Sequence, residues 1–411
     1  MCHPTISEDE FVGKLKVWRE STSTSPSGLH LGHYKALISR HQHSEVDSKA
    51  NETLQAQKTE LDMMQREMML LHLRLINYAL ERGYSHQRWQ TVANAMIFKE
   101  PGRNVKIQRT RVIHIYEADY NLSMGLKWRN AVFQAEEVDV LNQGQCGGRS
   151  KCTVSDPVLI EELQMDISRV SQKTVVQTNH DATACYDRIV PNLVMVASQK
   201  FGVSASVTQA CATSLEKAEY RIRTDSLGLA PTGYHHSPES PVLYGTGQGS
   251  AFSPAIRFLF ISCILCDIYE KLAKTAAYCY PDRSYLLEIG MIGCVDDNND
   301  QTNRFLQDED PTTLPLVLAQ TQRNAQTWND LLTASGGALE LRKCSYHVVH
   351  WKFAKIGSPV QVSPGDSIPP VLTFVLPLFL LLRLSHRQGK ITAISIRTLS
   401  YYSSNAYTVC I

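Results

Sequence analysis

Apolar side chains recur at three- and four-residue steps along several stretches of the chain, and this spacing predicts helices. In the longest stretch, residues 51–82, they are Leu54, Leu61, Met64, Met68, Leu71, Leu75 and Leu80. Gly83 follows directly and favours the end of a helix at that point. Further helices are expected over residues 156–170, 191–201, 254–274 and 312–334.

Shorter apolar runs between these helices predict β-strands. They cover residues 93–103, residues 173–181, residues 286–300 as two strands joined by a turn at Asp296 and Asp297, and residues 339–353 as a strand pair. The order of elements predicts an α+β fold, with an antiparallel sheet and helices on one of its faces. Asp181, Asp296 and Asp297 would then lie at strand ends.

Composition places the chain among globular proteins that carry no overall charge signature. It has 411 residues, 43% of them hydrophobic and 20% charged, with a formal net charge of +1. Any nucleic-acid surface must therefore come from local clusters of Lys and Arg. The eleven cysteines are scattered, and the first residues lack a signal-peptide pattern. We therefore expect reduced thiols, with Cys263 and Cys266 in the core, and an intracellular protein, nuclear or cytoplasmic.

The segment 368–384 is the most apolar part of the chain. It is shorter than the roughly 20 residues of a membrane-spanning helix, and it contains three prolines. We therefore expect no stable membrane association of the protein. Two interpretations of the segment itself stay open, a membrane segment and the product of a broken reading frame. After about Pro364 the helical periodicity disappears.

The acidic residues at strand ends suggest nucleotidyl transfer. That chemistry needs two or three carboxylates that hold a pair of Mg²⁺ ions, and Mg²⁺ prefers hard oxygen ligands. An Asp-Asp pair by itself is more often a solvated turn. A basic stretch also lies upstream of these carboxylates, and it would attract a triphosphate or a template backbone. Its members are Lys99, Arg103, Lys106, Arg109 and Arg111.

Six segments together resemble the ordered motifs of reverse transcriptases of the non-LTR retrotransposon type. They are SPSGLHLGHYKALI (25–38), FKEPGRNVKIQRTRVIHIYEADYN (98–121), HDATACYDRIV (180–190), YGTGQGSAFSPAIRFLF (244–260), GCVDDNN (293–299) and SGGALELRKCSYHVV (335–349). The resemblance implies a right-hand polymerase with fingers and palm, and an RNA-directed DNA polymerase activity that uses an RNA template, a DNA primer and dNTPs. The alternatives are an inactive retroelement remnant and an RNA-binding module.

The resemblance also implies a metal site. Two Mg²⁺ ions, or Mn²⁺ in their place, would be held by the carboxylates of Asp181, Asp296 and Asp297 and by the carbonyl of Ala182. Lys343 would be the general acid for pyrophosphate. His180, next to Asp181, is a further candidate for orienting that carboxylate.

The resemblance also implies residues that bind the incoming nucleotide. Tyr186 would exclude a ribose 2′-hydroxyl, and Gln248 and Gly249 would lie along the nucleotide and template. Lys99 and Arg111 would hold the triphosphate, with Lys106 and Arg109 as competing candidates.

The implied domains are a lead-in and long helix over 1–90, fingers over 91–165, palm over 166–350, and a thumb remnant or degenerate tail over 351–411. The thumb is therefore expected to be truncated or missing. Some residues depart from the family pattern. They are Cys294 before the Asp-Asp pair, Ala251 and Phe252 in the second motif, and Arg257 on an otherwise apolar helix.

Overall fold

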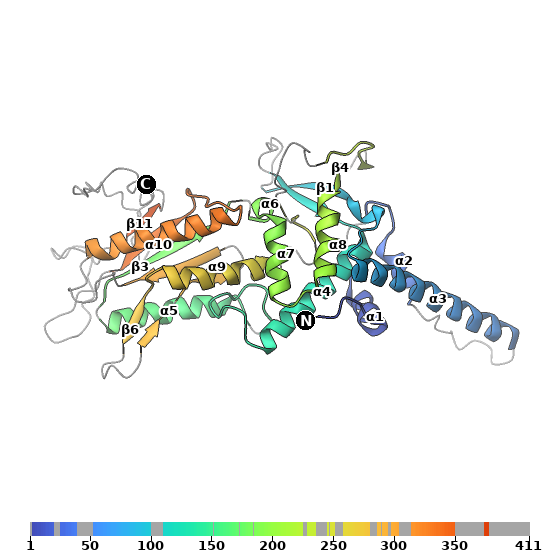
Figure 1. Ribbon diagram of the computed structural model, residues 1–411, viewed down its shortest axis with the longest axis horizontal. Coiled ribbons are helices and arrows are strands. Elements are labelled where there is room, and N and C mark those ends of the chain that lie inside the picture. Colours follow the sequence, from blue (N-terminus) through green and yellow to red (C-terminus); the bar gives the residue numbers. More distant parts are fainter. Residues whose placement is uncertain are drawn as a thin grey trace. The chain divides into compact units, whose positions relative to one another are not determined.

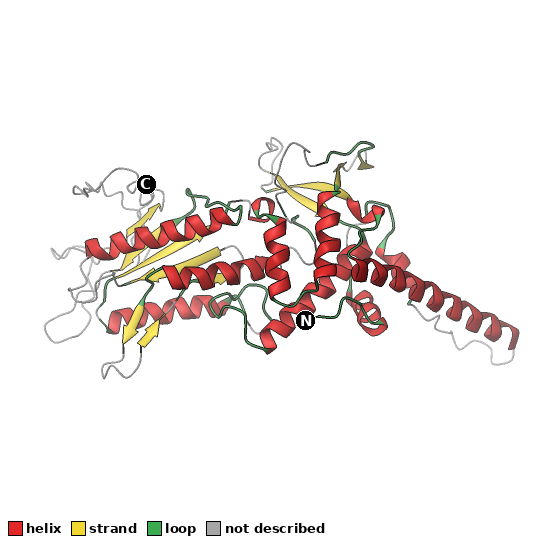
Figure 2. Ribbon diagram, in the orientation of Figure 1, coloured by secondary structure: helices red, strands yellow, loops and turns green. Residues whose placement is uncertain are grey.

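The chain forms two compact units, each built from two separate stretches of sequence. Unit 1 comprises Met1–Val140 and Val190–Arg257, and unit 2 comprises Leu141–Ile189 and Phe258–Ile411. The computed structural model (Figures 1 and 2) describes residues 2–19, 25–38, 52–99, 110–150, 152–171, 173–183, 185–224, 228–235, 245, 247–250, 258–279, 286–288, 290–294, 297–303, 314–349 and 374–377. The four consecutive domains expected from the sequence follow the order of the polymerase motifs and not the packing of the chain. They stay a prediction.

Unit 1 combines helices with a small mixed sheet. Its helices are α1 (Glu8–Val17), α2 (Leu31–Ala36), α3 (Glu52–Arg82), a 3-10 turn (Gln87–Gln90), α4 (Ala118–Glu137), α7 (Pro191–Lys200) and α8 (Ala205–Glu216). The sheet has the order β2-β1-β4-β5, with β1 (Thr91–Phe98), β2 (Thr110–Ile115), β4 (Glu219–Thr224) and β5 (Gly228–Leu229). Strand β1 pairs with β2 antiparallel and with β4 parallel.

Helix α4 lies in the core of unit 1. Tyr120 and Trp128 are fully buried, and the Trp128 indole donates to the hydroxyl of Ser198 on α7 at 3.0 Å. Asp119 is also buried, and it accepts hydrogen bonds from Arg88 and from the Trp89 indole. The sequence did not predict this helix, because its buried side chains surround it instead of forming one apolar stripe.

Unit 2 is an antiparallel sheet with helices. The sheet has the order β11-β10-β3-β9-β8, formed by β3 (Val175–Asp181), β8 (Ile292–Cys294), β9 (Asp297–Thr302), β10 (Ser345–Val349) and β11 (Phe374–Pro377). The other elements are α5 (Ser155–Val170), α6 (Cys185–Arg188), α9 (Phe258–Leu272), α10 (Leu314–Ala334) and the strand pair β6 (Ala277–Cys279) and β7 (Leu286–Glu288). The predicted α+β class and antiparallel sheet are confirmed here.

The two faces of the β3–β9 pair have different surroundings. On one face, Tyr269 of α9 donates to the Asp300 carboxylate at 2.9 Å, and Asn324 of α10 donates to the Thr302 hydroxyl at 2.9 Å. On the other face, the carboxylate of Glu161 on α5 accepts hydrogen bonds from Gln177 at 2.9 Å and from Asn299 at 2.6 Å. The prediction of helices on one face was therefore wrong, since α5 reaches the second face.

Most predicted elements appear in the structure. Helices α3, α5, α7, α9 and α10 and strands β1, β3, β8 and β9 correspond to predicted segments. Of the strand pair expected over 339–353, residues 339–349 are described. They hold one strand, Ser345–Val349, while Leu339 forms an isolated bridge with Ala182, so the first strand of the expected pair is wrong. The missing strand follows from a turn over residues 341–343, whose Lys343 amide donates to the Glu340 carbonyl.

The expectations for the tail lie largely outside the described residues. Within 368–384 only Phe374–Pro377 is described, as strand β11 paired with β10. Among the described helices, none is both long enough and apolar enough to cross a membrane. Cys263 and Cys266 are fully buried in α9, as predicted.

Candidate active site

Asp181 and Asp297 lie directly opposite each other on neighbouring strands. They are Cα partners at the end of the antiparallel β3–β9 pair, and side chains at such positions share one face of the sheet. Asp297 also pairs with Cys294 across β8 and β9. The predicted hairpin at the Asp-Asp pair is confirmed, while Asp296 itself lies outside the described residues.

Lys343 contacts the same carboxylate group. Its ammonium lies 3.2 Å from Oδ1 and 3.1 Å from Oδ2 of Asp181. The Lys343 side chain is 66% exposed and that of Asp181 27% exposed, so the pair lies at the surface and can exchange partners. The hydrogen bond from Lys343 to Asp181 raises the pKa of the lysine. Lys343 is an ammonium at neutral pH with or without this shift, since its ordinary pKa is 10.5.

Backbone hydrogen bonds hold the Lys343 segment against the end of β3. The Glu340 amide donates to the Asp181 carbonyl, and the Thr183 amide donates to the Ala338 carbonyl, each at 2.8 Å. The Thr183 hydroxyl donates to the Glu340 carboxylate at 2.9 Å. This pattern directs the Ala182 carbonyl away from the 338–340 segment, because successive residues of a strand point their carbonyls to opposite sides.

Cys344 packs behind Asp181. The Asp181 amide lies 3.3 Å from its Sγ atom. Burial raises the pKa of the Cys344 thiol to about 11, which keeps it neutral and unreactive at physiological pH. This thiol is therefore a packing group and not a nucleophile.

The chemistry of the donor set fits a magnesium ion. Asp181, Asp297 and the Ala182 carbonyl offer hard oxygen atoms at one end of the sheet, which is the ligand type that Mg²⁺ prefers. The described residues contain no group of three or more His, Cys, Asp and Glu side chains that could hold a metal. The third predicted carboxylate, Asp296, lies between β8 and β9, outside the described residues.

His180 is not a partner of Asp181. Its imidazole points to the opposite face of β3, where Nε2 lies 2.9 Å from Oδ1 of Asp300. Both side chains are buried. The prediction that His180 orients Asp181 was wrong, because neighbouring strand residues face opposite sides of a sheet. Asp300 is a buried charged residue of unit 2 that the sequence did not predict, because the polar run Asn298, Asn299 and Asp300 gives no sign of burial.

The predicted nucleotide-binding residues of unit 1 lie on or beside its sheet. The Gln248 carbonyl accepts a hydrogen bond from the His114 amide of β2 at 2.7 Å. Gly249 has a φ of +121°, and a Cβ atom there would lie 2.5 Å from the His114 carbonyl oxygen and 2.9 Å from a methyl of Ile113. Only glycine fits this position without displacing β2.

The predicted triphosphate cations are only partly described. Lys99 directly follows β1, and Arg111 lies on β2 opposite Ile97, so both exposed cations belong to the same end of one hairpin. The competing candidates Lys106 and Arg109 lie outside the described residues. Tyr186 lies in α6, and its side chain is not among the described ones.

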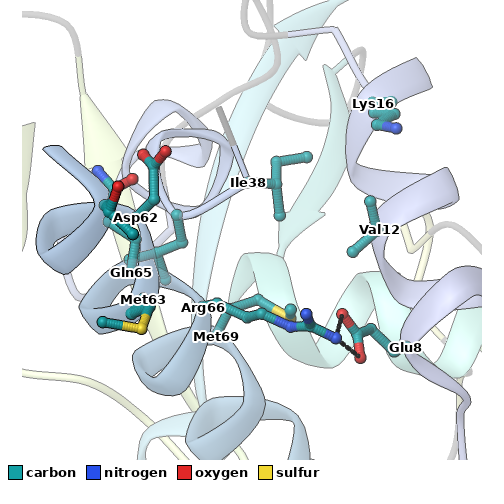
Figure 3. Close-up of a pocket in the computed structure, with 11 residues that line it drawn as sticks. Glu8, Val12, Lys16, Ile38, Asp62, Met63, Gln65, Arg66 and Met69 are labelled. Carbon is teal, nitrogen blue, oxygen red and sulfur yellow. Dashed lines mark hydrogen bonds and ion pairs between the residues drawn. The ribbon is translucent and has the colours of Figure 1, made fainter. Parts of the chain in front are cut away.

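Unit 1 also contains a cavity that is separate from the predicted site residues. It measures about 510 Å³ and lies between α1, the end of α2 and α3 (Figure 3). Glu8 and Arg66 form an ion pair at 3.4 Å on its wall. None of its lining residues is a predicted site residue, so the cavity does not bear on the assignment of the carboxylate site.

Comparison with known proteins does not assign this chain to a family. No protein-family model matches the chain, and no curated protein matches it significantly. One similar solved structure is apo telomerase from Candida tropicalis truncated from its C-terminal domain, with a TM-score of 0.43, 11% identity, and coverage of 66% of this chain and 52% of that one. Another is telomerase from Candida tropicalis with the TWJ fragment of telomeric RNA, with a TM-score of 0.40, 12% identity, and coverage of 66% and 42%. The chain thus spans about half the length of these structures or less, and overlaps at these scores carry no argument about its family or activity.

Proposed function

We propose that this chain is a nucleotidyltransferase of the reverse transcriptase type, an RNA-directed DNA polymerase of a non-LTR retroelement. The observation that supports this most is the convergence of Asp181, Asp297 and Lys343 at one end of the unit 2 sheet. The motifs that carry the resemblance supply all three residues. Two carboxylates and a cation on adjacent strand ends are the minimal equipment for phosphoryl transfer.

In this proposal two Mg²⁺ ions would be held by Asp181, Asp297, the Ala182 carbonyl and Asp296, which lies outside the described residues. When bound, the metal ions would activate the primer 3′-hydroxyl and stabilise the leaving pyrophosphate. Lys343 carries its proton at neutral pH, since its ordinary pKa is 10.5. Its Nζ atom then donates that proton to the leaving pyrophosphate oxygen.

The proposal assigns the remaining positions to substrate selection. Tyr186 would discriminate against the ribose 2′-hydroxyl, so that dNTPs are preferred. Gln248 and Gly249 would lie along the nucleotide and template, held in place by the hydrogen bond to His114. Lys99 and Arg111, or Lys106 and Arg109 in their place, would bind the triphosphate.

Primer extension tests the proposal. The full chain is incubated with poly(rA)/oligo(dT), dTTP and Mg²⁺, beside an Asp297→Asn variant and an Asp166→Asn control. Asp166 lies on the exposed surface of α5 in an ion pair with Arg169, so the control makes the same chemical change away from the site. We expect extension by the wild type and the control, and none by Asp297→Asn.

Two outcomes would contradict the proposal. Extension that survives Asp297→Asn would remove this residue from the metal site. A folded wild-type protein that extends no primer would favour an inactive retroelement remnant. Removal of the metal with EDTA should abolish extension, and added Mg²⁺ should restore it.

A further inference from the structure

Helix α3 carries apolar residues on two nearly opposite faces. On one face Met69, Leu73, Ile76 and Leu80 are buried within unit 1. The other face is a row of exposed apolar residues, which we call the α3 stripe. It consists of Leu61, Met64, Met68, Leu71, Leu75 and Tyr78.

The spacing of the α3 stripe is that of a coiled-coil seam. Its steps of three, four, three, four and three residues place the members at alternating a and d positions of a heptad repeat. Each of these residues is between 44% and 58% exposed. A single exposed apolar residue needs no explanation, but six along one helix face mark an interaction surface.

The N-terminal half of α3 meets α1 at the cavity of Figure 3 and in the Glu8–Arg66 ion pair, but it packs less closely there than its C-terminal half does. None of the side chains of residues 59–68 is buried, and in Figure 1 this part of the helix extends beyond the other labelled elements of unit 1. Isolated helices are marginal in water, because most helical stability comes from a packed apolar face. On α3 the cavity of Figure 3 is lined by Thr59, Asp62, Met63, Gln65, Arg66 and Met69, so none of the six stripe residues belongs to its wall.

We propose that the α3 stripe pairs with the α3 stripe of a second copy of this chain, as an antiparallel two-helix coiled coil. In this register Leu61 packs against Tyr78 of the second copy, Met64 against Leu75, and Met68 against Leu71. A two-fold axis between positions 69 and 70 repeats each contact. All six layers are then apolar, and the inference is independent of the proposed polymerase activity.

Flanking charges select the antiparallel orientation. Glu67 and Arg74 are exposed and occupy the g positions beside the central layers. In the antiparallel register Glu67 of each copy faces Arg74 of the other, which gives two opposite-charge pairs. A parallel pair would instead place Glu67 beside His72, and Arg74 beside Ala79. Glu60 and Glu81 meet only at the outermost layers, where both remain in water next to Arg82.

Sedimentation equilibrium of the full chain tests the pairing. We expect the wild type to form a dimer of twice the 46.1 kDa chain mass at micromolar concentration, and Leu71→Glu to raise the dissociation constant at least about tenfold, because it buries two carboxylates in apolar layers. The matched control is Leu159→Glu on α5, since Leu71 and Leu159 are both 58% exposed on helices. The control should dimerise like the wild type.

A charge exchange tests the orientation. Arg74→Glu should weaken the dimer by placing Glu67 opposite a second glutamate, and the double variant Glu67→Arg, Arg74→Glu should restore it. Restoration is the outcome that only the antiparallel register predicts. A wild type that stays monomeric, or a dimer that Leu71→Glu and Leu159→Glu affect equally, would overturn the proposal and indicate that another segment or another protein covers the stripe.

Discussion

The imidazole of His180 hydrogen-bonds to the carboxylate of Asp300 directly behind the candidate active site, with 2.9 Å between Nε2 and Oδ1. Tyr269 of α9 donates to the second oxygen of the same carboxylate at 2.9 Å. Burial, and then the charge of Asp300, raise the pKa of Tyr269 well above its ordinary value, so this phenol remains a donor. The network joins β3, β9 and α9 one residue away from Asp181 and thereby fixes the strand ends that carry the carboxylates.

Loss of this network should loosen the sheet. Asp300→Ala leaves a buried imidazole and a buried phenol without their shared acceptor. We expect it to destabilise unit 2 by about 2–6 kcal/mol, because two buried polar groups each lose their hydrogen-bond partner at a cost of about 1–3 kcal/mol. Hydrogen exchange of the β3 and β9 amides measures the effect locally. Asp166→Asn, which removes an exposed ion pair, should change protection by less than about 0.5 kcal/mol. Equal effects of the two substitutions would show that the network does not stabilise the strands.

Gly249→Ala should destabilise unit 1 by about 1–3 kcal/mol, because an alanine there adopts a disfavoured backbone conformation and contacts the His114 carbonyl. Gly13→Ala on α1 is the matched control, since a Cβ at Gly13 meets no atom within 4 Å. Alanine is the better helix former, so this control should stabilise the protein by about 0.5–1 kcal/mol. Urea unfolding of both variants measures the difference. A neutral Gly249→Ala would mean that the loop accommodates the methyl group without strain.

Lys343 variants separate proton donation from structure. We expect Lys343→Met to lower the rate of primer extension by about 10²- to 10⁴-fold, the usual range for loss of a general acid. Its stability should change by less than about 1 kcal/mol, because the ion pair with Asp181 is exposed. Lys343→Arg keeps the charge but holds its proton too tightly to donate it. A Lys343→Arg enzyme as fast as the wild type would assign this residue an electrostatic role instead.

The sequence predicted the strand ends of the site better than their surroundings. Asp181 and the Asp297 hairpin follow from local periodicity and turn chemistry, which act over a few neighbouring residues. The contact between Lys343 and Asp181 depends on two segments that are far apart in the chain, and only the resemblance connected them. The same limit applies to α3, whose periodicity predicts a helix but does not say that Leu61 and Met64 are exposed while Met69 is buried.

His347 should make the stability of unit 2 depend on pH. It lies on β10, and the Asn179 amide is 3.3 Å from its Nε2 atom. Burial lowers the pKa of His347 below its ordinary value of 6.5. The unfolded chain therefore binds this proton more readily than the folded one. Its contribution to stability is fully present above pH 6.5 and is lost as pH falls through the lowered pKa of the folded state.

Hydrogen exchange of β3 and β10 amides between pH 7 and pH 5, corrected for the intrinsic exchange rate, measures this loss. The wild type should lose protection across this range, since a protonated imidazole is costly to bury and no longer accepts a hydrogen bond from Asn179. His347→Gln retains a polar side chain that does not titrate, so its protection should fall less steeply over the same range. Parallel slopes for the two proteins would place the pH dependence of this sheet in other groups.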